Sequence, residues 1–347
     1  MLVSDWADAG LREEVRRGRR PRPEYLVLEQ RHGVELLDWS RLPGGCRGRS
    51  TRLSLRHVRA AALRGVDVVF TDGEHLAVPM AMLKRARRLP VPHLTIGHHL
   101  TTRAKWPYFR VLRADRGIDR IVVHSSPQVD LVNRLLGVPR RKLALVPYCA
   151  DADFWSPRPA AEEALVVSAG REHRDYLTLA AAAEGCPFDV AIAAGSLHSP
   201  AATWTRPASW PANFRLGFAD HLALRDLYTR AGVVVVPLVP NDFQAGVTTL
   251  VEAMAMGKAV VVTATAGQRD VVVDGETGVT VPPGDAGALQ RALLRLLLDP
   301  AERRRLGDNA RRAVEREFSV DVYAARLARH AFELGPGSRP AVGERSA

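Results

Sequence analysis

The stretch from Asn241 to Val262 carries the residue types and spacing that point most directly to chemistry. Gly246 opens a segment with helical character, Glu252 lies inside it, and Gly257 ends it before a valine-rich run. The free N–H groups at the start of a helix, aided by the helix dipole, bind phosphate, and a carboxylate binds hydroxyl groups. The stretch therefore predicts a site for a phosphate and a sugar.

Glu252 also has a purely structural interpretation. Thr249 and Glu252 have the spacing of a capping box, in which the acid only satisfies backbone N–H groups at the start of a helix. The spacing alone leaves both interpretations open.

Two sets of short apolar segments must position this stretch. In the amino-terminal half, helix-length spacers separate most of the predicted strands, which are Tyr25–Leu28, Val34–Leu37, Val66–Phe70, His93–Ile96, Ile121–Val123 and Leu143–Val146. The carboxy-terminal half repeats the pattern at Leu165–Ser168, Phe188–Ala193, Phe214–Phe218, Val233–Val236, Ala259–Thr263 and Val279–Val281. Strands that alternate with helices predict an α/β fold with two Rossmann-like, doubly wound parallel sheets.

The proline-bounded, aromatic segment 147–157 marks the boundary between two predicted domains. We expect an amino-terminal domain at residues 1–150 and a carboxy-terminal domain at residues 151–318. A helix at residues 319–334 is expected to pack back toward the amino-terminal domain, and residues 335–347 have the composition of a disordered tail. The basic run 19–23 is interpreted as a solvated connector.

Ligands of such folds bind at the carboxyl ends of the strands, so the residues just after each strand are the next candidates. His98 and His99 follow a buried strand, where an imidazole can donate to a hydroxyl or meet a phosphate. A structural role stays as open as a binding role for His98. Asp72, Glu74 and His75 follow the preceding strand and suit an acceptor hydroxyl, although Asp-Gly is also a common turn.

In the carboxy-terminal half, Gly170, Arg171 and Arg174 follow the first predicted strand. Glycine lets the backbone approach a ligand, and arginine matches a diphosphate through parallel hydrogen bonds. A charged turn with Arg171 paired to a carboxylate explains the same residues equally well. Gly246 and Val247 follow the fourth strand and present helix N–H groups to a phosphate.

The composition excludes several classes of protein. The chain has 347 residues, of which 46% are hydrophobic, and a formal net charge of +11. Arginines are spread along the chain without a nucleic-acid-binding motif, so the charge predicts a solvated surface and no nucleic-acid partner. Peripheral contact with an anionic membrane stays open. Three distant cysteines, no signal-peptide core and no apolar run of membrane-span length favour a cytoplasmic protein.

Three motifs, in this order, resemble the retaining glycosyltransferases of the GT-B fold, specifically family 4, group 1. Segment 147–154 resembles the interdomain segment of the family. Seven residues separate Gln244 from Glu252, where the family has two glutamates at this spacing, and segment 273–285 resembles the signature that follows. The resemblance covers the carboxy-terminal half well and the amino-terminal half loosely. It implies two Rossmann-like domains that face each other across a cleft.

The resemblance also implies roles for single residues. Glu252 would hold the ribose hydroxyls of a nucleotide, and Arg171, with Arg174 and Gly170 beside it, would bind the diphosphate. His98 stands where a histidine of the family contacts the donor sugar.

Three departures from the family pattern matter. Asp270 stands near a position where the family usually has a glutamate. Gln244 replaces the acid that contacts the transferred sugar, so a charged acceptor of hydrogen bonds becomes a neutral group that donates and accepts. The glycine-rich loop that the family places after its first strand is not recognisable after Tyr25–Leu28. The acceptor side of the site is therefore undefined in the sequence.

These observations predict a metal-independent, retaining glycosyltransferase that moves a hexose-type sugar from a nucleotide-diphosphate sugar to an unidentified acceptor, with no cofactor beyond that donor. The predicted catalytic residues are His98, Arg171 and Gln244; positive groups and the helix start at Gly246 would stabilise the leaving diphosphate. A nucleotide-sugar epimerase of the same fold, a non-catalytic nucleotide-sugar-binding protein and a nucleic-acid-binding protein are the alternatives.

Overall fold

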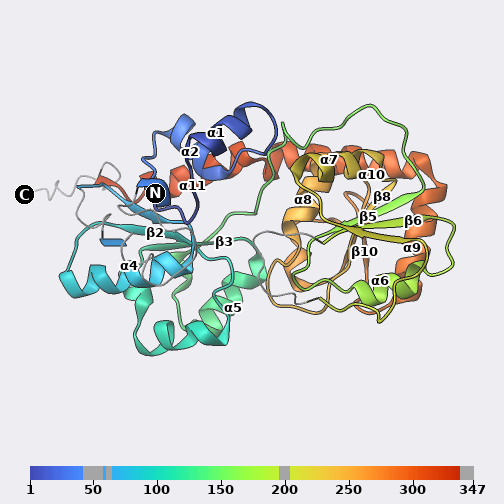
Figure 1. The fold of residues 1–347 in the computed structure, drawn as a ribbon. Coiled ribbons are helices and arrows are strands. Elements are labelled where there is room, and N and C mark those ends of the chain that lie inside the picture. The colour runs from blue at the N-terminus through green and yellow to red at the C-terminus, as the bar shows by residue number, and fades with distance from the viewer. Residues whose placement is uncertain (42–57, 60–64, 195–203, 337–347) are drawn as a thin grey trace, which may run out of the picture. The chain divides into compact units, whose positions relative to one another are not determined.

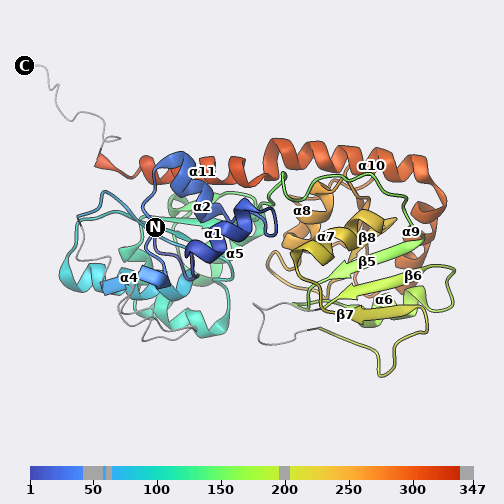
Figure 2. The ribbon, with the colours of Figure 1, turned by 45° about the horizontal axis from the view of Figure 1, so that its top comes forward.

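The computed structural model describes residues 1–41, 58–59, 65–194 and 204–336. The chain divides into two compact units, which are drawn in Figures 1 and 2. The first unit consists of Met1–Glu13, Pro23–Val146 and the residues from Ala324 on, and the second consists of Glu14–Arg22 and Pro147–Tyr323. Each unit is therefore built from segments that are not contiguous in the sequence.

The first unit contains a parallel four-stranded sheet in the order β1-β2-β3-β4. Its strands are β1 (Val69–Thr71), β2 (His93–Ile96), β3 (Arg120–Val123) and β4 (Leu143–Leu145). Helices α4 (Glu74–Arg87) and α5 (Ser126–Leu136) follow β1 and β3, and their apolar residues pack in the same clusters as those of the sheet. The unit also contains α2 (Glu24–His32) and most of α11 (Val320–Phe332).

The first strand of the predicted sheet was placed wrongly. Tyr25–Leu28 lies in α2, a helix that starts after Pro23 and ends at Gly33 in the left-handed conformation. Four consecutive buried residues fit a buried helix turn as well as a strand, so the apolar run alone could not separate the two. The place beside β1 is taken by Leu2, whose N–H donates to Phe70 O at 2.7 Å and whose carbonyl accepts from Asp72 N at 3.1 Å.

The second unit contains a parallel six-stranded sheet in the order β10-β9-β8-β5-β6-β7. Its strands are β5 (Leu165–Ala169), β6 (Asp189–Ala193), β7 (Phe214–Gly217), β8 (Val233–Val236), β9 (Val260–Thr263) and β10 (Val279–Val281). Strand β5 has β6 on one side and β8 on the other, so the strand order reverses between β5 and β8. Ligands of doubly wound sheets bind at such a switch point, outside the carboxyl ends of the strands.

Both faces of this sheet are covered by helices, as Figure 2 shows. Val233 and Val235 of β8 pack with α6 (Tyr176–Ala183) and α9 (Ala286–Leu298), while Val234 and Val236 pack with α7 (His221–Arg230) and α8 (Val247–Ala255). Alternate residues of a strand point to opposite faces, which explains why the strand is apolar throughout. The prediction of two doubly wound α/β sheets is confirmed.

The chain closes with helices outside the sheet. Helix α10 (Pro300–Ala313) runs into a π-helical turn, Val314–Phe318, and α11 follows. Helix α1 (Ala9–Arg16) lies near the start of the chain. Within the described ranges, no helix combines the length and the apolar character that crossing a membrane requires.

Arg22 corrects the interpretation of the basic run as a solvated connector. Its guanidinium group donates to Asp151 Oδ1 at 2.6 and 3.0 Å and to Asp153 Oδ2 at 2.6 Å, and its backbone N–H donates to Asp151 Oδ2 at 2.7 Å. The hydrogen bond with Asp151 raises the pKa of Arg22. Arg22 therefore anchors segment Glu14–Arg22 to the second unit.

Candidate functional site

Arg174 is the buried cation at the switch point of the second sheet. The side chain follows β5, and the residue is 3% exposed. Its guanidinium group donates to Ala169 O at 2.9 Å, to Glu172 O at 2.8 Å and to Thr249 Oγ1 at 3.1 Å. Burial lowers the pKa of Arg174, and the nearby carboxylate of Glu172 is among the groups that oppose this shift. An arginine stays protonated in proteins, and the three groups that accept hydrogen bonds from it here are neutral.

Two glycines, one after each strand of the switch point, enclose this guanidinium group. Gly170 has φ +85°, and a Cβ there would lie 2.7 Å from Arg174 Nη2. Gly246 has φ +77°, and a Cβ there would lie 2.9 Å from Arg174 Nη1 and 2.7 Å from Val236 Cγ1. Both positions therefore require glycine, because a side chain at either one would displace the cation.

Gly246 is also the N-cap of α8, and it offers no side-chain acceptor to the helix. The first N–H groups of a helix have no partner within the helix, and the helix dipole places partial positive charge there. Val247, the first residue of α8, is buried against the sheet. Arg174 and the start of α8 thus bring positive charge together at one place, with the geometry of an anion-binding site.

Gln244 precedes this helix and is buried, with 6% of its surface exposed. Neither its amide oxygen nor its amide nitrogen has a hydrogen-bond partner among the described residues. A buried polar group without a partner costs stability and needs an explanation. An amide that both donates and accepts, left unsatisfied at the edge of an anion site, suits a ligand that carries hydroxyl groups.

Glu252 is not part of a capping box. Thr249 is the third residue of α8 rather than its N-cap, and its hydroxyl accepts from Arg174. The buried residues of α8 do not include Thr248 or Glu252, which lie one turn apart on the more exposed side of the helix. Burial nevertheless raises the pKa of Glu252 to about 8, and the nearby Tyr228 hydroxyl opposes this shift.

The structure therefore brings together Gly170, Arg174, Gln244, Gly246 and Val247 at the carboxyl ends of β5 and β8. Arg171 lies in the same loop and is only partly buried, and Glu252 lies farther along α8. The sequence interpretation missed Thr249 as the side-chain acceptor of Arg174. These residues are 75 positions apart, and no local pattern marks the contact.

His98 belongs to the first unit, where it follows β2. Its Nε2 lies 2.9 Å from Asp72 O, and its ring centroid lies 5.5 Å from that of His124, which follows β3. Burial and the nearby His98 lower the pKa of His124 to about 3, so this ring is neutral at physiological pH. Three strand ends thus meet around the exposed His98.

Asp72 and Glu74, the other candidates in this unit, hold the loops in place. Asp72 Oδ2 accepts from the backbone N–H and hydroxyl of Ser4 at 2.6 and 2.8 Å. Glu74 Oε1 accepts from His99 N at 2.7 Å and lies 3.3 Å from Lys105 Nζ. The pKa of Glu74 is lowered overall: burial raises it, but Lys105, His98 and backbone N–H groups together lower it by more. Glu74 therefore stays ionised. His75 is exposed.

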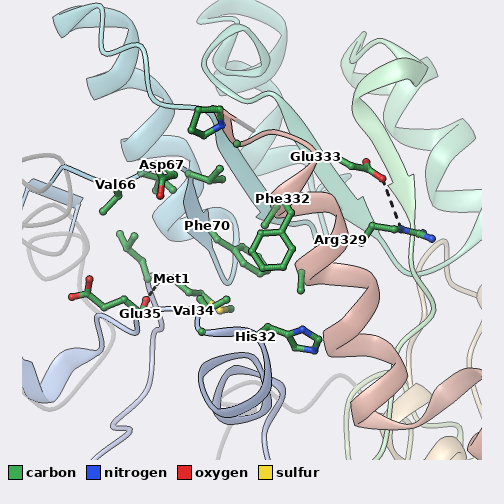
Figure 3. A pocket seen from close by; sticks show the side chains of 18 of the residues that line it. Met1, His32, Val34, Glu35, Val66, Asp67, Phe70, Arg329, Phe332 and Glu333 are labelled. Carbon is green, nitrogen blue, oxygen red and sulfur yellow. Dashed lines mark hydrogen bonds and ion pairs between the residues drawn. The ribbon is translucent and has the colours of Figure 1, made fainter. Parts of the chain in front are cut away.

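A cavity of about 1080 Å³ lies elsewhere in the first unit and is shown in Figure 3. It is lined by the start of the chain, the residues that lead into β1 and the end of α11, and both Phe70 and Phe332 are among its lining residues (Figure 3). None of the candidate site residues lines it. It lies at the amino-terminal end of β1, whereas His98 follows the carboxyl end of β2.

Both domains of the chain match family models of known proteins. Residues 2–154 match the family model described as Glycosyltransferase Family 4, and residues 213–313 match that of Glycosyl transferases group 1. MMP alpha-(1->4)-mannosyltransferase of Mycolicibacterium hassiacum is 40% identical over 91 residues, which cover 26% of this chain and 22% of that protein. The capsular polysaccharide biosynthesis glycosyltransferase CapM of Staphylococcus aureus is 38% identical over 72 residues, which cover 21% of this chain and 19% of CapM.

Solved structures share the fold over almost the whole chain. Anabaena HepE in complex with UDP-glucose superposes with a TM-score of 0.66 at 15% identity, covering 95% of this chain and 97% of that one. The sucrose-phosphate synthase of Thermosynechococcus elongatus superposes with a TM-score of 0.63 at 22% identity, covering 86% and 83%. These similarities establish the fold alone.

Two α/β domains with parallel sheets define the class, that of GT-B proteins. Within this class, the two matched segments, residues 2–154 and 213–313, are similar to the two domain families of the family 4, group 1 glycosyltransferases. The resemblance found in the sequence is thus confirmed, and the prediction of a glycosyltransferase agrees with the names of the family models and of the curated relatives. The matched segments cover between 13% and 30% of the length of the curated relatives.

Proposed function

We propose that the chain is a retaining glycosyltransferase that moves a hexose-type sugar from a nucleotide-diphosphate sugar to an acceptor hydroxyl, without a metal ion or a further cofactor. One observation carries this proposal: Arg174 is enclosed by Gly170 and Gly246 at the switch point, beside the start of α8. A diphosphate is the ligand that this arrangement fits best, because it is an anion with many acceptor oxygens.

The chemistry asked of this site is electrostatic. When the bond between the anomeric carbon and the diphosphate breaks, negative charge grows on the leaving oxygen. Arg174 and the helix N–H groups at Gly246 are positive groups fixed before the reaction, and such groups stabilise developing charge without reorganisation. Arg171, in the same loop as Arg174, adds a further positive charge. The acceptor hydroxyl attacks the anomeric carbon on the face that the diphosphate leaves, and its proton passes to the leaving diphosphate oxygen. This step retains the configuration and needs no protein nucleophile.

The remaining residues have roles in binding. We assign Glu252 to the ribose hydroxyls and Gln244 to the transferred sugar, since the first lies on the more exposed side of α8 and the second has an unsatisfied buried amide. His98, at the strand ends of the first unit, is assigned to the donor sugar by resemblance to the family. The nucleotide base and the acceptor are left unassigned.

A thermal-shift panel of UDP, GDP, TDP and ADP sugars tests the proposal. A ligand at a hundred times its Kd adds about 2.7 kcal/mol to the free energy of unfolding, and at least one donor should produce such a shift. Glu252→Ala should abolish the shift with the fold retained. The matched control is Glu163→Ala, which removes an exposed carboxylate paired with Arg230 and should keep the shift. A panel without any stabilising nucleotide would contradict the proposal.

A non-catalytic nucleotide-sugar-binding protein is the second candidate, and the amide of Gln244 in place of an acid is the observation that favours it. The two functions differ in turnover. The enzyme releases the nucleoside diphosphate from its donor when an acceptor is present, whereas a binding protein shows the thermal shift without any release.

A further inference from the structure

Three buried polar side chains on two neighbouring loops of the second unit have atoms without hydrogen-bond partners among the described residues. Gln244 follows β8, while Thr265 and Gln268 follow β9, and their exposed fractions are 6%, 9% and 2%. The unpartnered atoms are both amide atoms of Gln244, the hydroxyl of Thr265 and the amide oxygen of Gln268. Such atoms are rare in protein interiors, so three residues at one sheet edge point to a ligand.

The two loops are packed directly against each other. A Cβ at Gly267 would lie 2.2 Å from Phe243 O and 3.0 Å from Gln244 Cα. Gln268 Nε2 donates to Ala245 O at 2.6 Å. The loop after β9 therefore holds the backbone on both sides of Gln244.

These contacts also decide which atoms remain available. The hydrogen bond to Ala245 O fixes the amide of Gln268, so its oxygen is left as an acceptor. Thr265 stands at the N-cap of the short helical turn Ala266–Gln268, but its side chain does not cap that turn. Neither residue's free oxygen is needed for the local fold.

We propose that Thr265 and Gln268 join Gln244 in a subsite that binds hydroxyl groups of a neutral sugar. This inference rests on the proposed function, and it adds two residues and a substrate class to it. Hydroxyl groups both donate and accept, which matches the free amide N–H groups of Gln244 and the free oxygens of all three side chains. The three side chains carry no charge, so this subsite differs in chemistry from the phosphate-binding part at Arg174.

The test separates the sugar from the diphosphate. Thr265→Val replaces an unpartnered hydroxyl by a methyl group of similar size. Calorimetric titration would compare the best-binding donor among UDP-, GDP-, TDP- and ADP-glucose or -mannose with the matching nucleoside diphosphate. We expect Thr265→Val to weaken the sugar nucleotide about three- to tenfold, the value of one lost hydrogen bond, and to leave the diphosphate unchanged. Thr265→Ser, which keeps the hydroxyl, should bind as the wild type does.

Gln268→Met supplies a second variant, and Thr229→Val the matched control. Gln268→Met removes the free oxygen together with the bond to Ala245, so the ratio of the two affinities, rather than stability, is its readout. Thr229 is also 9% exposed, but its hydroxyl donates to Arg225 O at 2.8 Å inside α7, so its loss should leave the ratio unchanged.

The outcomes distinguish this inference from the proposed function. The measured ratio is the affinity for the sugar nucleotide divided by the affinity for the matching nucleoside diphosphate. A lower ratio in Thr265→Val and Gln268→Met, but not in the Thr229→Val control, supports the subsite. Ratios unchanged in both variants would overturn it and leave nucleotide-sugar binding intact. A wild-type protein that binds none of the nucleotides would overturn the proposed function, and the subsite with it.

Discussion

Glu252→Gln should change how the stability of the protein depends on pH. Burial raises the pKa of Glu252 from 4.5 to about 8. Between these two pH values the native protein holds a proton that the unfolded chain has released, so the free energy of unfolding falls as the pH rises. The stability linked to this group is complete below pH 4.5 and is lost as the pH rises through 8.

The size of the effect follows from the shift. One pKa unit corresponds to about 1.4 kcal/mol, so a fully buried group would lose about 4 kcal/mol between roughly pH 5 and pH 8. Glu252 lies on the more exposed side of α8 and is only partly buried, so we expect about half of this, roughly 2 kcal/mol, after screening by solvent. A glutamine does not titrate, and its variant should lack this loss.

Urea denaturation followed by circular dichroism at about pH 5, 6, 7 and 8 measures the difference. The free energy of unfolding of the wild type should fall relative to that of Glu252→Gln at each step. Glu163→Gln is the matched control, because a hydrogen bond from Arg230 lowers the pKa of the exposed Glu163 and no such fall should appear. Wild-type and Glu252→Gln curves that run parallel would refute the reasoning.

Three further substitutions test other parts of the structure. Gly246→Ala should lower the free energy of unfolding in urea by about 2–3 kcal/mol, because φ is +77° and the new Cβ would overlap Val236. Gly275→Ala is the control, since Gly275 has φ +72° in open space and its substitution should cost about 1 kcal/mol. Equal costs would contradict the close packing at Gly246. Burial lowers the pKa of His93 from 6.5 to about 4, so between these pH values the unfolded chain binds a proton that the native protein does not. The free energy of unfolding of the wild type should therefore fall by about 3 kcal/mol as the pH falls through this window, and His93→Gln should remove this fall. The same fall in His93→Gln would show that His93 is not its cause. Arg22→Met leaves the carboxylate of Asp151 buried without its guanidinium partner and should cost about 3 kcal/mol by thermal unfolding, while a cost below about 0.5 kcal/mol would mark the pair as dispensable.

The central strands of the second unit could be predicted because β5, β8 and β9 are buried on both faces. Val233–Val236 is apolar at every position, and such a run between helix-length spacers has few other interpretations. The same rule failed at Tyr25–Leu28, where a short apolar run forms one buried turn of a helix. The start and stop signals at Pro23 and Gly33 were present in the sequence, and they outweigh composition in a run this short.

The candidate site could be predicted only in part. Gly170, Arg174 and Gly246 were recognisable as candidates because they follow strands, where ligands of doubly wound sheets bind, although a charged turn explained Gly170 and Arg174 equally well. The contact among them was not recognisable, because the guanidinium group of Arg174 lies between two glycines that follow strands far apart in the sequence. The free amide of Gln244 was hidden for the same reason, because a missing partner is a property of the folded surroundings rather than of the chain.

The division of the chain into interleaved segments has a consequence for biosynthesis. The first unit needs α11 beyond Ala324, where His330 Nδ1 lies 2.8 Å from Arg120 Nη1, and the second needs the early segment with Arg22. Neither unit is complete in contacts until more than 320 residues have left the ribosome. The nascent chain therefore exposes one unfinished unit while the other is being made, and fragments cut at the middle of the sequence should aggregate or attract chaperones rather than fold.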